Sequence, residues 1–200
     1  LGPYRNVIAA FGPETPERLI VGAHYDAYGP FPGADDNASG TAGLLELARL
    51  LGRAELPLRV ELVAFSTEEP PYFATPHMGS AAHADLLKRS GAKVRAMIAL
   101  EMIGYFSDEP GSQSYPAPLL RLYYPGRGDF ITVVGSPGGI GLTRRVKKAM
   151  SGGPLPVYSI TGPAFIPGID YSDHASYWSA GYPAVMINDT AFYRNKQYHK

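Results

Sequence analysis

The chain has 200 residues, about the length of one domain, and 45% of them are hydrophobic, which is enough to form a buried core. Lysine plus arginine and aspartate plus glutamate each number 18, so the formal net charge is zero. This balance argues against a nucleic-acid surface, which needs an excess of positive charge. The absence of cysteine excludes disulfides, thiolate metal sites and a cysteine nucleophile. No stretch approaches the roughly 18 apolar residues of a membrane span.

Five short apolar runs predict buried β-strands, because most are nearly continuous, as in strands covered on both faces. They span residues 18–23, 60–66, 95–100, 130–134 and 184–187. Helical patterns occupy residues 41–51, 78–90, 142–150 and 172–180. The first of these has a broad apolar stripe of Leu44, Leu45, Leu47, Ala48, Leu50 and Leu51. Strands that alternate with helices predict a largely parallel α/β sheet.

Two segments rich in glycine and proline predict long surface loops, at residues 107–128 and 154–168. Within the second loop, residues 157–160 are an alternative short strand. We find no internal repeat and no domain boundary, which predicts a single domain over residues 1–200.

Ionisable side chains follow several of the predicted strands directly. His24 and Asp26 come after the first strand, Glu68 and Glu69 after the second, and Glu101 after the third. Ligands bind beyond the carboxyl ends of strands in open α/β sheets, so we expect these groups to lie close together.

Each of these groups has a structural explanation when taken alone. His24 and Asp26 could be a surface hydrogen-bonded pair, and Glu68 and Glu69 two solvated charges in a turn. The run Asp35-Asp36-Asn37 in Gly33–Gly40 is typical of a turn and a helix cap. Glu101 is harder to explain in this way, because a carboxylate directly after an apolar run is costly to desolvate without a partner such as a cation.

Histidine and carboxylate ligands without thiolates favour zinc, with manganese or cobalt as substitutes. Two imidazoles and three carboxylates exceed the usual ligand set of one catalytic zinc. They fit two metals about 3.5–4 Å apart that share one carboxylate, an arrangement common in hydrolases. Adjacent side chains in an extended segment point to opposite sides, so one of Glu68 and Glu69 can bind metal while the other acts as a general base.

Six short sequence motifs, in order along the chain, make it similar to a known family. They are His24-Tyr25-Asp26, residues 33–41 (GADDNASGT), residues 66–69 (STEE), residues 100–103 (LEMI), Ser172-Asp173-His174 with residues 180–183 (AGYP), and Tyr198-His199. In these motifs the chain resembles the zinc-dependent, co-catalytic aminopeptidases of family M28, the bacterial leucyl-aminopeptidase type. The resemblance implies the three-layer α/β fold of zinc exopeptidases (phosphorylase/hydrolase-like), with a mostly parallel mixed sheet flanked by helices, as one catalytic peptidase domain.

The resemblance also implies roles for individual residues. The metal ligands would be His24 and Glu101 for the first zinc, Glu69 and His199 for the second, and Asp36 for both. Asp26 would orient the imidazole of His24, and Glu68 would be the general base. Tyr198 would stabilise the oxyanion through its hydroxyl group, as in some relatives. Met102 and Tyr171 are expected, from their place in or near the predicted site loops, to line an apolar pocket for the amino-terminal residue of a peptide substrate.

Several neighbouring positions receive expectations from the same resemblance. The bond between Asp36 and Asn37 is expected to be cis, and Asp35 to be structural. Asp173 and His174 are expected to shape the wall of the site, although His174 is a rival for the last ligand position. From the residue pattern instead, Trp178 falls on a predicted helix and is expected in the core, whereas His77, His83 and the basic residues of 144–148 are expected to be ordinary surface features.

The chain departs from the family pattern at two of the ligands. Glu101 stands where many relatives carry Asp, and His199 is the penultimate residue, so that the Thr and the acid that usually follow are missing. An amino-terminal helix of the family is missing as well, so the alternative is that this chain is the core of a longer enzyme.

Two other functions stay open from sequence. One is a glutaminyl cyclase, a zinc-dependent acyltransferase that uses one working zinc on a related scaffold. The other is a non-catalytic binding module derived from a peptidase. The first residues lack the features of a signal peptide. Export is favoured only because members of the family are often exported. The sequence makes no prediction of the oligomeric state.

Overall fold

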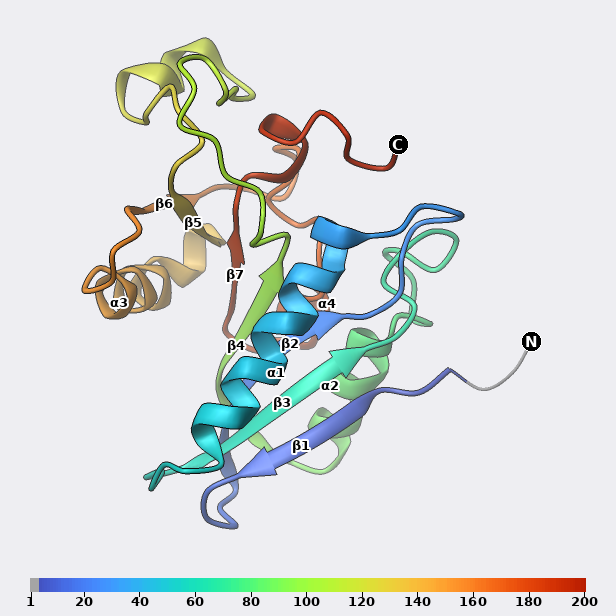
Figure 1. Ribbon diagram of the computed structural model, residues 1–200. Helices are drawn as coiled ribbons and strands as arrows, with labels where there is room; N and C mark the ends of the chain where they lie inside the picture. Colours follow the sequence, from blue (N-terminus) through green and yellow to red (C-terminus); the bar gives the residue numbers. More distant parts are fainter. Residues whose placement is uncertain (1–3) are drawn as a thin grey trace.

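The computed structural model describes residues 4–200. The first three residues, which belong to the stretch that lacks the features of a signal peptide, lie outside the described residues. The described residues form a seven-stranded sheet in the order β1-β3-β2-β4-β7-β5-β6 (Figure 1). The strands are β1 Val7–Phe11, β2 Glu17–His24, β3 Arg59–Phe65, β4 Lys93–Glu101, β5 Ile131–Gly135, β6 Val157–Thr161 and β7 Ala184–Asn188. The α-helices are α1 Gly40–Leu51, α2 Gly79–Arg89, α3 Ile140–Met150 and α4 His174–Ala180.

The sheet is mixed, with a parallel centre. Strand β2 pairs in parallel with β3 and with β4, and β4 pairs in parallel with β7. At one edge β1 runs antiparallel to β3, and at the other β5 runs antiparallel to β7 and parallel to β6. The predicted α/β class with a mostly parallel mixed sheet is therefore confirmed.

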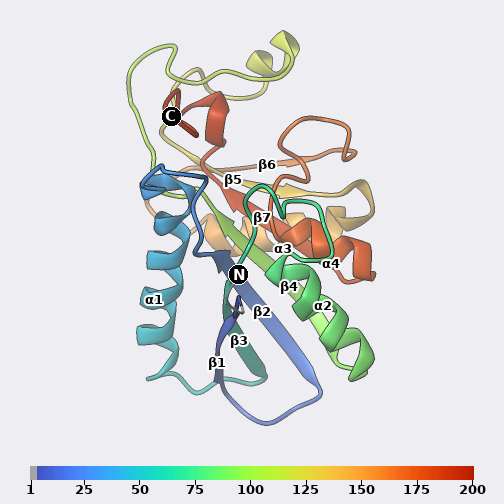
Figure 2. The same ribbon diagram turned by 90° about the vertical axis from the view of Figure 1, so that its right-hand side faces the viewer.

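Helices cover both faces of this sheet, because successive strand residues point to opposite faces. Helix α1 packs on Val21, Leu62 and Leu100, and α3 packs on Val133 and Val185 of the same face. Helices α2 and α4 pack on the opposite face, where Ile20, Val63 and Met97 belong to one buried cluster. Figure 2 shows α1 on one side of the sheet and α2 and α4 on the other.

Most predicted helices and strands are confirmed. Two differences concern strands, and two concern the burial of side chains. Strand β1 was not predicted, and the alternative strand at 157–160 exists as β6. Leu45 and Leu50 of the predicted apolar stripe are 69% and 50% exposed. His83 of α2 is buried against α4, where it forms a hydrogen bond with Tyr177, so the prediction that it is a surface residue is wrong.

The carboxyl ends of the parallel strands meet at one end of the molecule. The beginning of α1 and the C-terminal segment, residues 189–200, lie at the same end (Figure 1). No helix of residues 4–200 combines the length and the apolar character that crossing a membrane requires. The fold therefore gathers β2, β3, β4 and the C-terminal segment around one region.

Candidate metal centre

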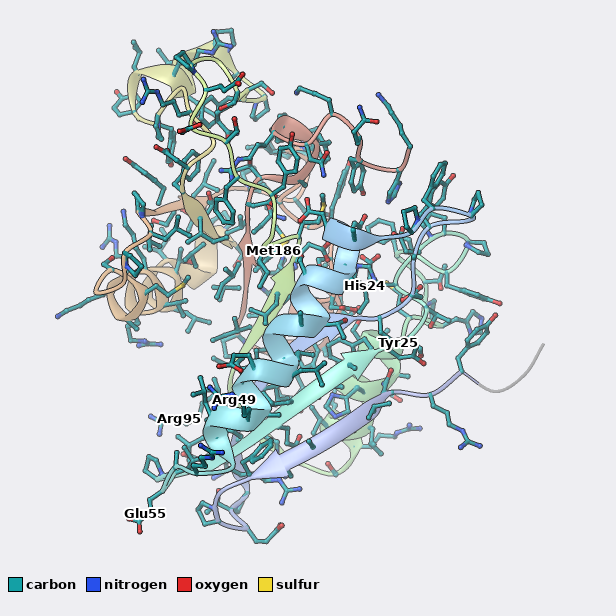
Figure 3. The ribbon with its side chains drawn as sticks, in the orientation of Figure 1. His24, Tyr25, Arg49, Glu55, Arg95 and Met186 are labelled. Carbon is teal, nitrogen blue, oxygen red and sulfur yellow. The ribbon has the colours of Figure 1, made fainter. Side chains whose placement is uncertain are left out.

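The candidate donor side chains come from five separate segments of the chain. His24 ends β2 and Glu101 ends β4, while Glu68 and Glu69 follow β3. Asp36 lies in the turn between β2 and α1, and His199 lies in the C-terminal segment. Figure 3 shows His24 near the upper end of the sheet, whereas Arg49, Arg95 and Glu55 lie at the lower end.

Asp36 stands between the two imidazoles. Its Oδ1 lies 3.1 Å from Nε2 of His24, and its Oδ2 lies 2.9 Å from Nε2 of His199. Each oxygen of this one carboxylate therefore faces a different imidazole nitrogen. The peptide bond from Asp36 to Asn37 is cis, which confirms that expectation.

The first group of donors surrounds His24, which is fully buried. Its Nε2 atom lies 3.4 Å from Oε2 of Glu101 and 3.9 Å from Oε2 of Glu68. His24, Asp36 and Glu101 each offer one ligand atom, and the three atoms lie within 4.8 Å of one another. The hydroxyl of Ser172 donates a 2.7 Å hydrogen bond to Oε2 of Glu101 and so orients that carboxylate.

The second group of donors is Asp36, Glu69 and His199, whose ligand atoms also lie within 4.8 Å of one another. Nε2 of His199 lies 3.2 Å from Oε1 of Glu69. The imidazole of His199 stacks on the rings of Tyr28 and Tyr198, with centroids 4.3 Å and 3.8 Å away. This stacking fixes the plane of the ring.

Asp26 supports the site in a way that sequence did not predict. Its two carboxylate oxygens accept hydrogen bonds from the backbone N–H groups of Glu68 and Glu69, both at 3.1 Å. Nδ1 of His24 lies 3.0 Å from the backbone carbonyl oxygen of Asp26, and 3.6 Å from its carboxylate. The carboxylate therefore holds the Glu68–Glu69 segment, while the backbone of the same residue orients the imidazole.

Sequence reasoning missed Asn37, which ties the turn of Asp36 to the end of β4. Its Nδ2 donates to the carbonyl of Leu100 at 2.8 Å, and its Oδ1 accepts from the backbone N–H of Met102 at 3.1 Å. The signal that could have found it is its place directly after the candidate bridging acid. Met102 has a positive φ of 46°, and Thr67 before Glu68 has one of 56°, a strained region where functional residues concentrate.

The three glutamates of the site have raised pKa values, whereas for Asp36 burial alone would raise the pKa but the two histidines lower it. Burial, then the nearby charge of Asp36, raises the pKa of Glu69 to about 8. Burial also raises the pKa of Glu68 and of Glu101. Burial alone would lower the pKa of His24, but the carboxylates of Glu101 and Glu68 raise it well above its ordinary value. A site of this kind has an excess of negative charge that a cation would offset.

The donor set fits divalent metal ions. Nε2 of His24 and Oε1 of Glu69 are buried, yet neither forms a hydrogen bond to any residue of 4–200. Unpaired buried polar atoms are costly, and a bound cation would give both atoms a partner. Imidazole nitrogen and carboxylate oxygen without sulfur are ligands that zinc accepts.

Several cavities adjoin the donors. One, the acidic cavity, is lined by Asp36, Glu68, Glu69 and His199. Another, the apolar cavity, has a mainly apolar wall that includes Val134, Ile160, Ile166 and Met186. Tyr171 and Tyr198 line both of these cavities, and Met102 lines the apolar one. The three predicted substrate-binding residues therefore lie at or beside the donors.

The other singled-out residues lie outside both donor groups. His174 is buried, its Nε2 lies 2.8 Å from the carbonyl oxygen of Ile169, and its ring packs edge-on against Trp178. Trp178 packs against the core cluster, as predicted. Asp173 is fully buried, and its two oxygens have no hydrogen-bond partner among the described residues.

Comparison with other sequences identifies relatives over nearly the whole chain. The chain is 55% identical over 207 residues to YfbL of Escherichia coli (strain K12), a match that covers 99% of this chain and 63% of that protein. It is 29% identical over 208 residues to leucine aminopeptidase 1 of Ajellomyces capsulatus, which covers 97% and 48%. The chain thus spans between about half and 63% of the length of these curated relatives.

Solved structures share the fold. A zinc aminopeptidase from Bacillus subtilis matches with a TM-score of 0.65 and 23% identity, over 96% of this chain and 43% of that one. A glutaminyl cyclase from Porphyromonas gingivalis matches with a TM-score of 0.60 and 26% identity, over 92% and 61%. The sequence model of Peptidase family M28 matches residues 6–200. The chain therefore belongs to peptidase family M28.

Proposed function

We propose that the protein is a two-zinc aminopeptidase that removes amino-terminal residues from peptides. The observation that carries this proposal is the position of Asp36, whose two oxygens face the imidazoles of His24 and His199 at 3.1 Å and 2.9 Å. One carboxylate between two imidazoles can serve two metals about 3.5–4 Å apart, a spacing that recurs in hydrolases. His24 and Glu101 would complete the first metal site, and Glu69 and His199 the second.

The reaction would use a water molecule as the nucleophile. Zinc held by these side chains would lower the pKa of that water and polarise the carbonyl of the substrate. Glu68 would accept the proton of the attacking water and then pass it to the departing amine. Burial raises the pKa of Glu68, which makes its carboxylate a stronger proton acceptor than an exposed glutamate.

Tyr198 would stabilise the negative charge that develops on the carbonyl oxygen. Burial raises the pKa of Tyr198, so its hydroxyl stays protonated and can donate a hydrogen bond. The ring also lines the acidic cavity and the apolar cavity beside the donors. This position suits a group that contacts the substrate where the two cavities meet.

The apolar cavity would bind the side chain of the amino-terminal residue. Its wall of Val134, Ile160, Ile166 and Met186 favours apolar side chains over charged ones. The acidic donors beside it would attract the free α-amino group of the substrate. Together these features favour cleavage after one apolar amino-terminal residue.

The test combines metal content with substrate assays. Protein freed of metal by chelation and reloaded with zinc should contain two zinc ions per chain by elemental analysis, and it should hydrolyse leucine amide. Two results would overturn the proposal. One is hydrolysis of leucine amide by the metal-free protein, and the other is failure of the zinc-reloaded protein to hydrolyse any of a panel of aminoacyl amides.

The similarity to a solved glutaminyl cyclase keeps a second function in view. Such an enzyme would cyclise an amino-terminal glutamine and use one working zinc. The two donor groups around Asp36 favour the hydrolase, because each offers three ligands. Cyclisation of a glutaminyl peptide by protein with one zinc per chain would favour the cyclase instead.

A further inference from the structure

The two donor groups differ in how the backbone supports them. His24 and Glu101 end strands at the centre of the sheet. His199 instead lies in a segment where residues 194–200 form turns, without helix or strand. No ladder of helix or strand hydrogen bonds holds this segment, so the position of His199 depends on side-chain and turn contacts.

Asp35 makes such a contact. Its Oδ2 accepts a 3.0 Å hydrogen bond from Nδ2 of Asn195, and its Oδ1 accepts a 3.2 Å hydrogen bond from the backbone N–H of Gly104. Asp35 precedes Asp36, Gly104 follows Glu101 by three residues, and Asn195 precedes His199 by four. One carboxylate therefore joins the three segments that carry these ligands.

Asn195 in turn shapes the path to His199. Its side chain is 8% exposed, and its Oδ1 accepts from the backbone N–H of Gln197 at 2.9 Å. Its backbone carbonyl accepts from the N–H of Tyr198 at 3.4 Å. The hydrogen bond to Asp35 therefore fixes the turn that places Tyr198 and His199.

The preceding residue anchors the same segment to other loops. The guanidinium group of Arg194 is buried and donates to Oε1 of Gln113 at 3.0 Å and to the carbonyls of Tyr105 and Phe130, both at 2.9 Å. Arg194 thus fixes the start of the segment, and the hydrogen bond between Asp35 and Asn195 ties the next residue to the turn that carries Asp36.

We propose that Asp35 and Asn195 are a positioning pair for the second metal site, which holds His199 against the bridging Asp36. This inference rests on the two-metal function proposed above. Neither residue would bind metal. Partners that orient a ligand in this way typically change metal affinity 10- to 100-fold when they are replaced.

The test exchanges the two side chains. In Asp35→Asn, the new amide has one accepting oxygen where the native carboxylate has two, so one of its two hydrogen bonds is lost. Asn195→Asp sets two carboxylates against each other. The double variant Asp35→Asn/Asn195→Asp restores every bond, because the amide at position 35 donates to the carboxylate at position 195, which also accepts from Gln197.

The readout is the affinity for each of two zinc equivalents, measured by competition with a chromogenic chelator. Each single variant should bind the second zinc about 10-fold or more weakly and the first zinc as the wild type does. The double variant should regain the second affinity to within about threefold. The control Asp108→Asn makes the same change of charge on an exposed loop and should leave both affinities unchanged.

The outcomes separate this inference from the proposed function. Wild-type protein that binds one zinc overturns both. Two zinc ions in the wild type with equal affinities in every variant, or a double variant no better than the single ones, overturns the positioning pair alone. If Asp35→Asn does not fold, Asn195→Ala removes the same bond from the other side, and an unchanged second affinity in that variant overturns the inference.

Discussion

Glu68 and Glu69 are adjacent carboxylates with different surroundings. Glu69 lies beside His199, whereas Oε2 of Glu68 lies 3.9 Å from Nε2 of His24, and Glu68 also lines the acidic cavity. The backbone N–H groups of both are held by Asp26. This arrangement lets one carboxylate bind metal while the next one handles a proton.

Replacing Glu68 tests that division. Glu68→Gln should lower kcat by about 100-fold or more, because general-base catalysis contributes on the order of 10²–10⁴. Zinc content should stay at two ions per chain. The control Glu55→Gln, at the far end of the molecule, should keep full activity (Figure 3). Loss of one zinc from Glu68→Gln would instead identify Glu68 as a ligand.

His174 provides a prediction on pH and stability. Burial lowers the pKa of His174 to about 4, while an unfolded histidine titrates near 6.5. Between these pH values the unfolded chain binds a proton that the folded protein does not, so the free energy of unfolding falls as the pH falls. The contribution lost between pH 6.5 and 4 is roughly 3 kcal/mol, at about 1.4 kcal/mol for each unit.

The variant His174→Gln isolates this effect, because its amide can keep the hydrogen bond to Ile169 and does not titrate. Urea unfolding of metal-free protein at several pH values should show that the wild type loses its advantage over the variant as the pH falls below 6.5. Parallel stability curves for the two proteins would contradict the prediction.

Helices α2 and α4 are joined by a buried polar contact. Nδ1 of His83 lies 2.6 Å from the hydroxyl oxygen of Tyr177, and both residues are buried. The hydroxyl groups of Ser80 and Ser176 form a second bond between the same helices at 3.0 Å. These contacts hold α4 against α2, and α4 directly follows the segment of Ser172, which orients Glu101.

Tyr177→Phe should destabilise the metal-free protein by about 1–3 kcal/mol, because it leaves a buried nitrogen of His83 without a partner. Chemical denaturation measures this change. The matched control is Tyr25→Phe, whose hydroxyl is bonded to the carbonyl of Arg5 at the surface, and which should change stability by less than about 0.5 kcal/mol. Equal effects of the two changes would show that the buried contact adds nothing.

The elements that sequence predicted well are those with a buried, nearly continuous apolar run. Strands β2, β3, β4 and β7 are of this kind. Strand β1 escaped because four of its five residues are exposed and it is recognisable only from its antiparallel pairing with β3. Leu45 and Leu50 show a related limit, since an apolar helix residue does not by itself reveal whether a neighbour covers it.

The candidate site was predictable to a similar extent. His24, Glu68, Glu69 and Glu101 could be chosen from the residues alone, because each ends or follows an apolar run. Asp36 and His199 came from family resemblance. The contacts of Asn37 with Leu100 and of Ser172 with Glu101 join residues 63 and 71 positions apart, and no local pattern encodes such a meeting.

At the scale of the whole molecule, the candidate donors connect segments that span nearly the full sequence, from His24 to His199. No single helix or strand provides a complete ligand set, and each donor group draws on three segments. Metal binding by these donors would therefore require the folded chain, and a ligand that binds only the folded state stabilises it.

Zinc should consequently raise the thermal stability of the protein. At 100 times its dissociation constant, each zinc adds about 2.7 kcal/mol, which corresponds to a rise in Tm of roughly 5–10 °C for a domain of this size. Calorimetry of chelated protein with and without zinc measures the shift. Magnesium, which prefers octahedral oxygen ligands, should give little shift, and the double variant His24→Ala/His199→Ala should give none. A Tm that zinc leaves unchanged in the wild type would mean that these side chains gather around one point without binding the metal.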